Sequence, residues 1–481
     1  MEHSSGEVNV RPELAEKQEP HVSHHDDIEA SPSAVDEKKL VRKIDRRLLP
    51  ILGCLYAVSL VDRGNMSFAL VAGMMEDLSL NVGDRYSILV LVFFAFYVVF
   101  ELPSNLVLPK AGPRNWLSFL GLSFGVVTIG MGFTRTWGHF LICRIFLGAT
   151  EAGFLPGCTF LISVWYTRYE VGKRLASFWV LSVLANGFAG ILAYGLTQMD
   201  GVQGLEGWRW IFIIEGCITC GIVVAAYLLI VDLPDKSEGF LKPHEKAAVI
   251  ARINADRGDA ESDAITKQKV LHHLKDWKLY AWMLLLFAAV VPGFSYNFFT
   301  PLILSQGMGF TRKQSLLMTA PPFVFAAIAT YTSSWISDKY RLRGPVYVFH
   351  LTCCIAGMFI TAYVKNPGAR YFGVFLGLGM VQYCPMVVLA WQANNVTSTS
   401  KRAVASAITL IGSGLGGMCS GGAFKTSEAP LYQTGIYLSL GLYFLSLTIV
   451  AGMEYYFYKM NKEAREGKRK IEGMDDWYYT Y

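Results

Sequence analysis

Residues 86–109 read YSILVLVFFAFYVVFELPSNLVLP, an almost unbroken apolar run in which Glu101 is the single charged residue. A helix needs about 20 such residues to cross the hydrocarbon core of a bilayer. Runs of this length recur along the chain, which predicts an all-α membrane protein rather than a soluble one. The twelve predicted spans are 48–71, 86–109, 116–133, 138–160, 175–198, 208–231, 279–304, 314–337, 346–364, 370–391, 403–424 and 433–457.

The composition of the 481-residue chain supports the same class. Hydrophobic residues make up 53% of it and charged residues only 17%, whereas ordinary soluble chains carry about 25% charged residues. The net charge of +5 is small and gives no reason to expect a nucleic-acid partner. The nine cysteines lie in apolar stretches and suggest neither disulfides nor a metal site, so we expect no metal and no cofactor.

The predicted spans fall into two blocks of six, residues 48–231 and 279–457, separated by a charged segment. Their similar lengths predict two pseudo-symmetric six-helix bundles joined by a cytosolic linker at 232–278. The polar segments 1–47 and 458–481 are predicted to be cytosolic tails, and the first lacks the apolar content that a folded segment needs, so we expect it to be disordered.

The distribution of Lys and Arg predicts the orientation of the chain. Short loops on the side of the amino terminus carry more Lys and Arg than those on the opposite side. Because positively charged loops stay in the cytosol, both termini are expected there.

Leaving aside groups near the span ends, six ionisable residues lie inside the predicted spans, and all of them belong to the first half of the chain. A charge at the bilayer centre costs at least ~2.5–3.5 kcal/mol on insertion scales, so each needs a partner, a water-filled cavity or a function. The six residues are Asp62, Arg63, Glu101, Arg144, Glu151 and Glu215.

Helical spacing predicts which of these side chains share a face. Arg144, Gly148 and Glu151 follow the spacing i, i+4, i+7 and therefore lie on one face of the fourth span. Asp62 is rotated by about 100° from Arg63 around the first span. The adjacent acid and base therefore need not neutralise each other.

We interpret Arg63 as a fixed cation for an anionic substrate, and Asp62 and Glu151 as groups that take up and release a proton. The protonation of a carboxyl group depends on burial and on neighbouring charges, and both change as a site opens to one side or the other. The alternative is a set of ion pairs that only fix helix packing, but buried pairs stabilise poorly on balance. For the other three ionisable residues a structural role and a functional role both remain open.

Two other motifs are interpreted as structural. Residues 412–417, GSGLGG, contain the GxGxxG pattern inside an apolar span and without a strand–helix–strand unit, so we expect close helix packing there. Trp208 and Trp210 flank a span end and are expected to anchor the membrane interface.

The motifs within the spans resemble those of the major facilitator superfamily, in particular its anion:cation symporter group and most of all the fungal allantoate permease subfamily. The resemblance extends from about Lys38 to about Met460. It is carried by DRGN at 62–65, FAFYVVFELPSN at 94–105, RIFLGATEAGFLPG at 144–157, GWRWIFIIEG at 207–216, WQANN at 391–395 and KR at 401–402.

The resemblance implies a transporter that moves small carboxylates together with protons by alternating access. It implies that Arg63 contacts a carboxylate, that Tyr97 lines the cavity, that Asp62 and Glu151 couple protons, and that Arg144 partners the acid of the fourth span. The expected partners are a small organic anion, protons and the lipid bilayer. The protein is expected to act as a monomer in a fungal plasma membrane.

Substrate specificity is expected to come from the second half, where neutral polar residues take the place of charges. Those predicted to face Arg63 across the midplane are Tyr296, Asn297, Gln382 and Tyr383.

Two alternatives to a carboxylate importer remain open at this point. The same cavity could export an acidic or polar fungal metabolite made by a linked biosynthetic gene cluster. A membrane enzyme or a nutrient sensor belongs to a different class. An enzyme needs a nucleophile–base or metal-ligand set facing one cavity, and the sequence shows no such set, so no enzymatic activity is expected.

Overall fold

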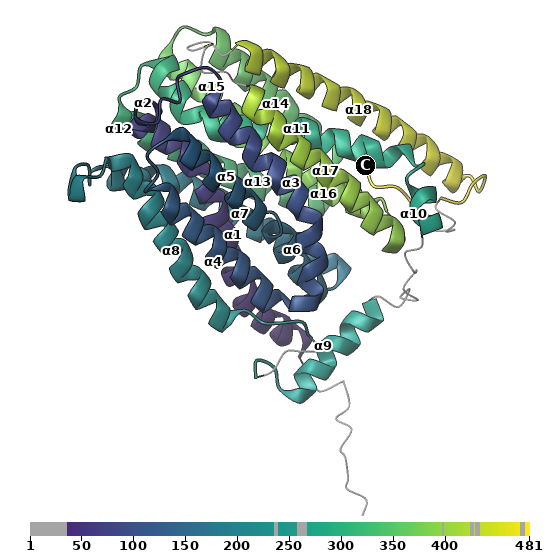
Figure 1. Cartoon of the computed structure of the whole chain (residues 1–481). Coiled ribbons are helices and arrows are strands. Elements are labelled where there is room, and N and C mark those ends of the chain that lie inside the picture. The colour runs from purple at the N-terminus through teal and green to yellow at the C-terminus, as the bar shows by residue number, and fades with distance from the viewer. Residues whose placement is uncertain are drawn as a thin grey trace, which may run out of the picture.

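The computed structural model is a bundle of long helices (Figure 1). The predicted disorder of residues 1–47 falls largely on residues 1–35, which lie outside the described part of the chain. The structure describes residues 36–234, 239–256, 267–396, 399–423, 428, 433–471 and 477–481.

The first half contains six helical rods, one of them continued by short elements and another interrupted. They are α1 (Glu37–Ala69) with η2 (Leu70–Met74) and α2 (Met75–Asp77), α3 (Arg85–Ala111), α4 (Pro113–Met131), α5 (Trp137–Glu151) with α6 (Phe154–Trp165), α7 (Arg168–Thr197) and α8 (Gly207–Leu229).

The second half repeats this plan after two linker helices, α9 (Pro243–Asp256) and α10 (Lys267–His273). Its rods are α11 (Trp277–Leu302) with η4 (Ile303–Gly307), α12 (Arg312–Leu317) with α13 (Ala320–Tyr340), α14 (Gly344–Tyr363), α15 (Pro367–Val381) with α16 (Cys384–Asn394), α17 (Thr399–Ala423) and α18 (Gln433–Arg465).

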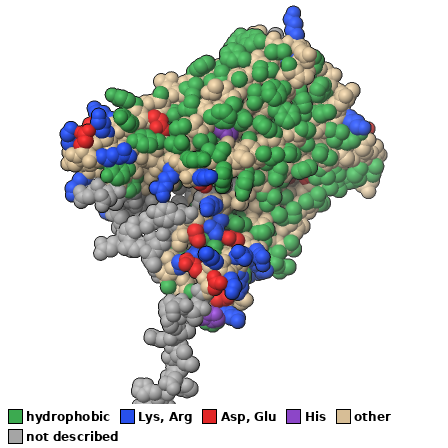
Figure 2. Space-filling view, turned by 180° about the vertical axis from the view of Figure 1, so that it is seen from behind, with side chains coloured by type: hydrophobic (Ala, Val, Ile, Leu, Met, Phe, Trp, Pro, Cys, Tyr) green, Lys and Arg blue, Asp and Glu red, His purple; other side chains and the backbone are tan. Residues whose placement is uncertain are grey.

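Ten of these rods are long and apolar enough to cross a membrane. The other two are α1, which contains Asp62 and Arg63, and α4, which begins with polar residues. Each packs along a neighbour that meets the criterion, α1 against α7 and α4 against α8. Together they form the predicted all-α fold of two six-helix bundles. Hydrophobic side chains cover most of the face in Figure 2, while charged ones gather at its lower end and left edge.

The first helix begins earlier than predicted. It starts at Glu37, and the Asp36 side chain caps it by accepting a hydrogen bond from the Lys39 amide at 3.3 Å. Leu40, Ile44 and Leu48 follow one another at intervals of four residues and are all buried. Residues 37–47 therefore form an amphipathic helix rather than part of a disordered tail, because one face is covered by the protein.

The end of the chain also differs from the predicted tail at 458–481. Helix α18 continues to Arg465, and residues 477–481 fold back onto the second half. The ring of Tyr479 stacks on that of Phe457 with centroids 4.5 Å apart. The carbonyl of Thr480 accepts a hydrogen bond from the Trp391 indole at 2.8 Å. Aromatic burial and backbone hydrogen bonds therefore hold this segment in place.

Two predicted spans are interrupted at their centres. A break at residues 152–153 separates α5 from α6, and one at residues 382–383 separates α15 from α16. Pro385 lies in the first turn of α16, where its missing N–H is tolerated. At Gly153 an added Cβ would overlap Ser104 of α3, so the close approach of α3 requires glycine. Both breaks lie beside polar residues of the predicted site.

The halves meet along α3 with α17 and α7 with α13. The Tyr86 hydroxyl donates to the Phe298 carbonyl at 3.4 Å, and the rings of Phe94 and Phe294 lie 5.0 Å apart. An added Cβ at Gly417 would overlap Phe94, which confirms the close packing predicted for residues 412–417. These contacts involve the first part of α3, on the side away from the amino-terminal end of α1.

Candidate transport site

The centre of the first half holds a buried ion pair between α1 and α5. The Nε of Arg63 donates to Oε1 of Glu151 at 2.7 Å, and the two side chains are only 6% and 0% exposed. The Ser59 hydroxyl donates to the same carboxylate oxygen. Glu151 is the last residue of α5, so the helix break follows it directly. The structure therefore joins Arg63 and Glu151, two residues predicted independently for the site.

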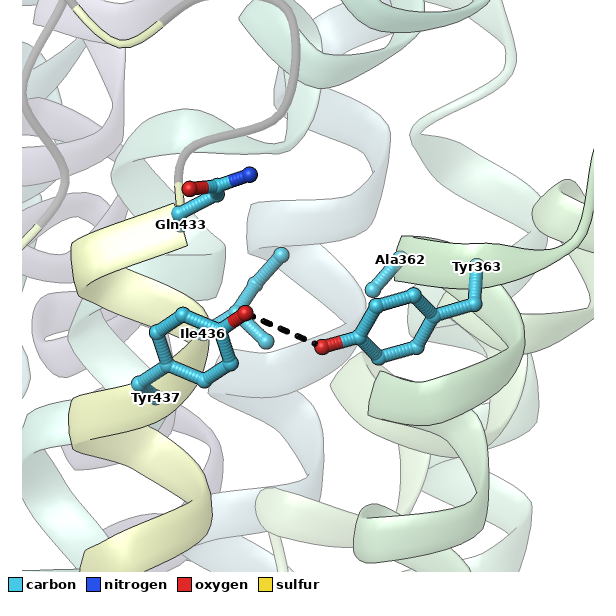
Figure 3. A pocket seen from close by; sticks show the side chains of 5 residues that line it. All are labelled: Ala362, Tyr363, Gln433, Ile436 and Tyr437. Atoms are coloured by element: carbon cyan, nitrogen blue, oxygen red, sulfur yellow. Dashed lines mark hydrogen bonds between the residues drawn. The ribbon is translucent and has the colours of Figure 1, made fainter.

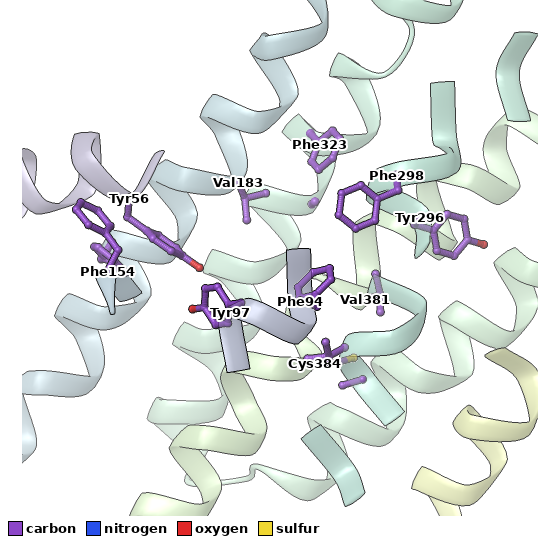
Figure 4. Packing of buried hydrophobic residues seen from close by; sticks show 14 of the residues in the cluster. Tyr56, Phe94, Tyr97, Phe154, Val183, Tyr296, Phe298, Phe323, Val381 and Cys384 are labelled. Carbon is purple, nitrogen blue, oxygen red and sulfur yellow. The ribbon is translucent and has the colours of Figure 1, made fainter. Parts of the chain in front are cut away.

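Aromatic rings of α3 form the wall beside this pair. The Arg63 guanidinium lies over the Tyr97 ring at 4.9 Å from its centroid and over the Phe93 ring at 5.7 Å. In Figure 4 the side chain of Tyr97 lies next to that of Tyr56 from α1. Aromatic faces attract cations and attract them more strongly where water is excluded. This wall therefore stabilises the charge of Arg63 without occupying its hydrogen-bond donors.

Arg144 occupies a different position from the one the resemblance implies. Its guanidinium lies over the Phe93 ring at 4.6 Å, and its Nε donates to the Leu89 carbonyl at 3.3 Å. The salt bridge of Glu151 is with Arg63. An added Cβ at Gly148 would overlap the Phe93 carbonyl, so glycine allows α5 to approach α3 this closely. Arg63 and Arg144 thus share one aromatic ring.

Both guanidinium groups retain buried donors that are not satisfied. Nη2 of Arg63 and both Nη atoms of Arg144 have no hydrogen-bond partner among the described residues. An unsatisfied buried donor costs about 1–3 kcal/mol. A carboxylate can accept two parallel hydrogen bonds from one guanidinium, which makes it a suitable ligand for such donors. These unsatisfied donors make the region a candidate site for an anion.

Asp62 faces away from Arg63, as the helical spacing predicted. Its Oδ1 accepts a hydrogen bond from Asn65 and its Oδ2 one from Thr219 of α8, each at 3.4 Å. Glu215, also on α8, is 3% exposed and lies on the same side of α1, facing Asn65. The first half therefore contains a second polar centre, distinct from the Arg63–Glu151 pair.

Glu101 lies one turn beyond Tyr97 on α3 and is half-buried. It is within electrostatic range of Arg63. This position places it beside the ion pair rather than in direct contact with it.

Two of the four residues predicted in the second half come together. The Gln382 amide donates to the Asn297 side-chain oxygen at 2.9 Å, which links the break between α15 and α16 to α11. The main-chain carbonyl of Gln382 accepts a hydrogen bond from the Trp179 indole of α7 at 3.2 Å. This hydrogen bond connects the break between α15 and α16 in the second half directly to α7 in the first half.

The other two predicted residues do not face the ion pair. The Tyr296 hydroxyl donates to the Met358 sulfur at 3.5 Å, and its side chain points away from Tyr97 in Figure 4. Tyr383 packs against His350 with ring centroids 4.4 Å apart. Both tyrosines belong to the packing of the second half.

Trp208 corrects another sequence-based expectation. It is 1% exposed, and its indole donates to Asp77 at 3.2 Å, so it does not anchor a lipid interface. Arg209 forms a salt bridge with the same carboxylate at 2.7 Å and a hydrogen bond to the Gly132 carbonyl at 3.3 Å. The hydrogen bond to Asp77 therefore outweighs the usual preference of tryptophan for the membrane interface. Trp208, Arg209 and Asp77 together stabilise one end of the first bundle.

Several contributing residues were not singled out from the sequence. Phe93 lies four residues before Tyr97, so helical spacing alone would place it on the same face. Asn65 and Thr219 contact Asp62 only because α1 and α8 pack together, and the sequence carries no direct signal for that contact.

A separate pocket lies between the end of α14 and the start of α18 (Figure 3). The hydroxyl groups of Tyr363 and Tyr437 lie 3.3 Å apart across it. Among the described residues, the lining contains none that is charged, so we assign the pocket no part in anion binding. It is lined by Ala362, Tyr363, Gln433, Ile436 and Tyr437.

Comparison with known proteins gives concordant results. Residues 52–421 match the profile described as Major Facilitator Superfamily. The MFS-type transporter cnsO of Penicillium expansum is 32% identical over 447 residues, covering 90% of this chain and 86% of that protein. The high-affinity nicotinic acid transporter of Saccharomyces cerevisiae is 31% identical over 448 residues, covering 92% and 82%. A solved D-xylose-proton symporter aligns with a TM-score of 0.62 at 14% identity, covering 84% and 97%, which supports the fold alone.

Proposed function

The chain belongs to the Major Facilitator Superfamily of multi-pass membrane transporters, and from this premise we propose that it imports a small organic carboxylate together with protons by alternating access. The substrate would be of the vitamin or nitrogen-source type. We place the protein in the plasma membrane with both termini in the cytosol, and within the allantoate permease subfamily. Its relatives are transporters and not enzymes.

The observation that carries the proposal is the set of buried, unsatisfied guanidinium donors. Arg63 uses Nε to hold Glu151 while its Nη2 has no partner among the described residues. Arg144 also lies over the Phe93 ring, and both of its Nη atoms lack a hydrogen-bond partner among the described residues. A substrate carboxylate entering this region would gain charge-assisted hydrogen bonds that no protein group now makes.

Exchange of partners at Arg63 supports coupling to protons. A substrate carboxylate that binds Arg63 competes with Glu151 for the same guanidinium. If Glu151 lost its cation while still buried, an isolated carboxylate would remain in a dry site, and such groups are neutralised rather than left charged. Glu151 would then take up a proton as the substrate binds, so that the anion and the proton travel together.

The contacts between the halves support an alternating-access cycle. Those contacts involve Tyr86 and Phe94 in the first part of α3, and Thr319 beside Gly190. The proposed orientation puts this side outside the cell. We therefore assign the present arrangement as closed on the extracellular side. The Trp179–Gln382 hydrogen bond lies between the halves and would have to break or move when they rock.

The relatives support the class of substrate. One is named for nicotinic acid, which is a small carboxylic acid. The chain covers 82% of that relative, so the likeness extends through both halves.

The proposal is tested by uptake of radiolabelled nicotinate, pantothenate, allantoate and biotin in yeast that lacks its own permeases. We expect at least one of these carboxylates to accumulate, faster at acidic than at neutral external pH. Glu151→Gln should abolish the pH dependence. Glu454→Gln, which changes a half-buried carboxyl on α18 in the second half, is the matched control and should retain it.

Uptake that is indifferent both to pH and to Glu151→Gln would contradict the proposed coupling. Net release of a solute from preloaded cells, with no uptake of any carboxylate, would favour the exporter instead.

A further inference from the structure

Two buried carboxylates, Asp62 on α1 and Glu215 on α8, lie within electrostatic range of each other, and neither forms a salt bridge among the described residues. Asp62 is 2% exposed and Glu215 is 3% exposed. Electrostatically, Asp62 feels mainly two other acids, Glu215 and Glu151. Within the described residues, neither carboxylate oxygen of Glu215 accepts a hydrogen bond. An acid pair that is buried in this way requires a compensating positive charge.

No basic group nearby supplies that charge. Arg63 is adjacent to Asp62 in sequence but is engaged with Glu151. The thiol of Cys220 on α8 is within electrostatic range of Asp62 but packs against Gly125 of α4, and it carries no positive charge.

The other helices packed against α1 and α8 are α4, α6, α7 and α11. The basic residues of α4, α7 and α11 lie in their first two turns, at 114, 168–174 and 278, and α6 has none. The basic residue of α8, Arg209, forms a salt bridge with Asp77. The pair is therefore surrounded by neutral groups and by Glu151.

The hydrogen bonds around the pair are unequal. Asp62 accepts from the Asn65 amide and from the Thr219 hydroxyl, which suits an ionised carboxylate. Glu215 interacts only with the Asn65 side chain and with no described donor in good hydrogen-bond geometry, which suits a protonated carboxylic acid. Asn65 lies between them, and its Oδ1 is buried without a donor. A proton on the pair would provide the donor that this oxygen lacks.

The charges of five of the six ionisable residues inside the first-half spans lead to the same number of protons, when the half-buried Glu101 is set aside. Arg63 and Arg144 bring two positive charges, and Glu151 pairs with one of them. If Asp62 and Glu215 carry a single negative charge between them, these five residues are neutral in sum. Two carboxylates that share a site cannot both ionise readily, and they titrate as a pair.

We propose that Asp62 and Glu215 hold one proton between them, at a site separate from the anion-binding site, and that this proton is carried with the substrate. The shared proton follows from the structure of the pair, whereas its transport rests on the proposed function. The proton resides as an O–H on one carboxyl group and is released to water when the pair ionises. The described residues contain no group of three His, Cys, Asp or Glu side chains suited to a metal ion, so the proposal commits to a proton.

The location of the pair explains how it would affect substrate binding. Asp62 and Glu151 interact electrostatically, so a proton on the pair removes negative charge beside the Arg63–Glu151 site. A substrate carboxylate then enters against less repulsion. By thermodynamic reciprocity, a bound carboxylate must strengthen proton binding at the pair to the same degree.

The test is infrared difference spectroscopy of the purified full-length protein in lipid, titrated from acidic to alkaline pH in H₂O and D₂O. We expect a protonated-carboxyl band at neutral pH that shifts in D₂O. Glu215→Gln and Asp62→Asn should each shift or remove this band, because each changes one member of the pair. The double variant should lose the band intensity of one carboxyl proton, while Glu466→Gln, which changes an exposed carboxyl paired with Lys468, leaves the band unchanged.

A band that is unaffected by the double variant would overturn the shared proton. A band that responds to Glu215→Gln but is indifferent to Asp62→Asn would also overturn it, since the proton would then belong to Glu215 alone. The single variants are close to isosteric, and size-exclusion profiles verify that they fold. The wild-type titration does not depend on any variant.

A parallel assay separates this inference from the proposed function. Liposomes containing the protein and an internal pH dye report proton entry when a carboxylate of the panel is added outside. If the infrared result holds but no carboxylate moves protons, the coupling fails and the shared proton stands. If proton entry is seen and Glu215→Gln leaves its rate within twofold of the wild type, the transported proton is not the one on this pair.

Discussion

The break between α5 and α6 and the break between α15 and α16 each place a polar residue near the centre of one half. In the first half that residue is Glu151, held by Arg63. In the second half it is Gln382, held by Asn297. A buried charge requires a countercharge or a proton, whereas a neutral amide exchanges hydrogen-bond partners at low cost. Under the proposed function, the first half would bind the ions and the second would recognise neutral parts of the substrate.

The two halves also differ in how completely their buried polar groups are hydrogen-bonded, as His350 of the second half shows. His350 is fully buried, and both of its ring nitrogens are hydrogen-bonded, one to the Met380 carbonyl at 2.8 Å and the other to Ser333 at 2.7 Å. In the first half, Arg63, Arg144 and Glu151 each retain buried atoms without a partner among the described residues, and the three residues lie together around Phe93 and Ser59. In the second half, Arg343 and Glu454 also retain one such atom each, but they lie at the start of α14.

The largest effect is expected from removing the cation of the first half. Arg63→Gln leaves Glu151 buried without a partner, and breaking such a pair costs about 3–5 kcal/mol. We expect carboxylate uptake to fall by at least about 100-fold when normalised to the protein at the cell surface.

Arg63→Lys is the matched control for this prediction. It keeps the charge but loses the planar fork of donors, so uptake should be intermediate. Uptake by Arg63→Gln at the wild-type rate would show that the first half does not bind the anion.

The next largest effect is expected from placing a charge in the second half. Gln382→Glu puts a carboxylate among neutral groups, and we expect a loss of several kcal/mol in stability. The measurement is thermal unfolding of the purified protein in detergent. Gln382→Ala removes only a neutral hydrogen bond and should cost about 1 kcal/mol. If Gln382→Glu is as stable as the wild type, the centre of the second half accommodates a buried charge, and the proposed contrast with the first half is wrong.

Removal of the carboxyl-terminal segment should weaken the second half selectively. Without residues 477–481, the indole of Trp391 loses its acceptor and the ring of Phe457 loses its stacking partner. We expect the midpoint of thermal unfolding to fall by several degrees. Hydrogen exchange should increase at the ends of α16 and α18 but not in α1 or α5. Uniform loss of protection across both halves would contradict this assignment.

The smallest effect concerns the linker helix α9. Lys43 hydrogen-bonds Glu245 at 2.6 Å and lowers the pKa of that carboxyl below its ordinary value of 4.5. The resulting stabilisation is present above the unfolded pKa and is lost as pH falls through the lower folded value. Because the pair is partly exposed, Glu245→Gln should weaken α9 docking by at most about 1 kcal/mol. Hydrogen exchange in α9 measures this, and unchanged protection across that acidic range would refute it.

The sequence predicted the class of fold and most residues of the site, since apolar length and charges within spans are local properties. It also predicted that the side chains of Asp62 and Arg63 point in different directions, because helical spacing alone determines this. It did not predict that Arg63, rather than Arg144, pairs with Glu151, since that choice depends on how α1, α3 and α5 pack around Phe93.

Other differences arose where tertiary contacts outweigh local signals. Polar residues at 37–47 suggested a tail, but Leu40 and Ile44 dock one face of that segment. Trp208 suggested a lipid interface, but Asp77 provides a buried acceptor. Tyr296 was predicted to face the cavity, but its partner, Met358, comes from a helix on the other side.

The central claim is that the charged core of the first half couples a carboxylate to protons. It is tested most directly in liposomes that contain the purified protein and an internal pH dye, with the panel of carboxylates added outside. The wild type and Glu454→Gln should acidify the interior with at least one carboxylate, and Glu151→Gln should not. If no carboxylate acidifies the interior through the wild type, or if Glu151→Gln acidifies it at the wild-type rate, the claim is contradicted.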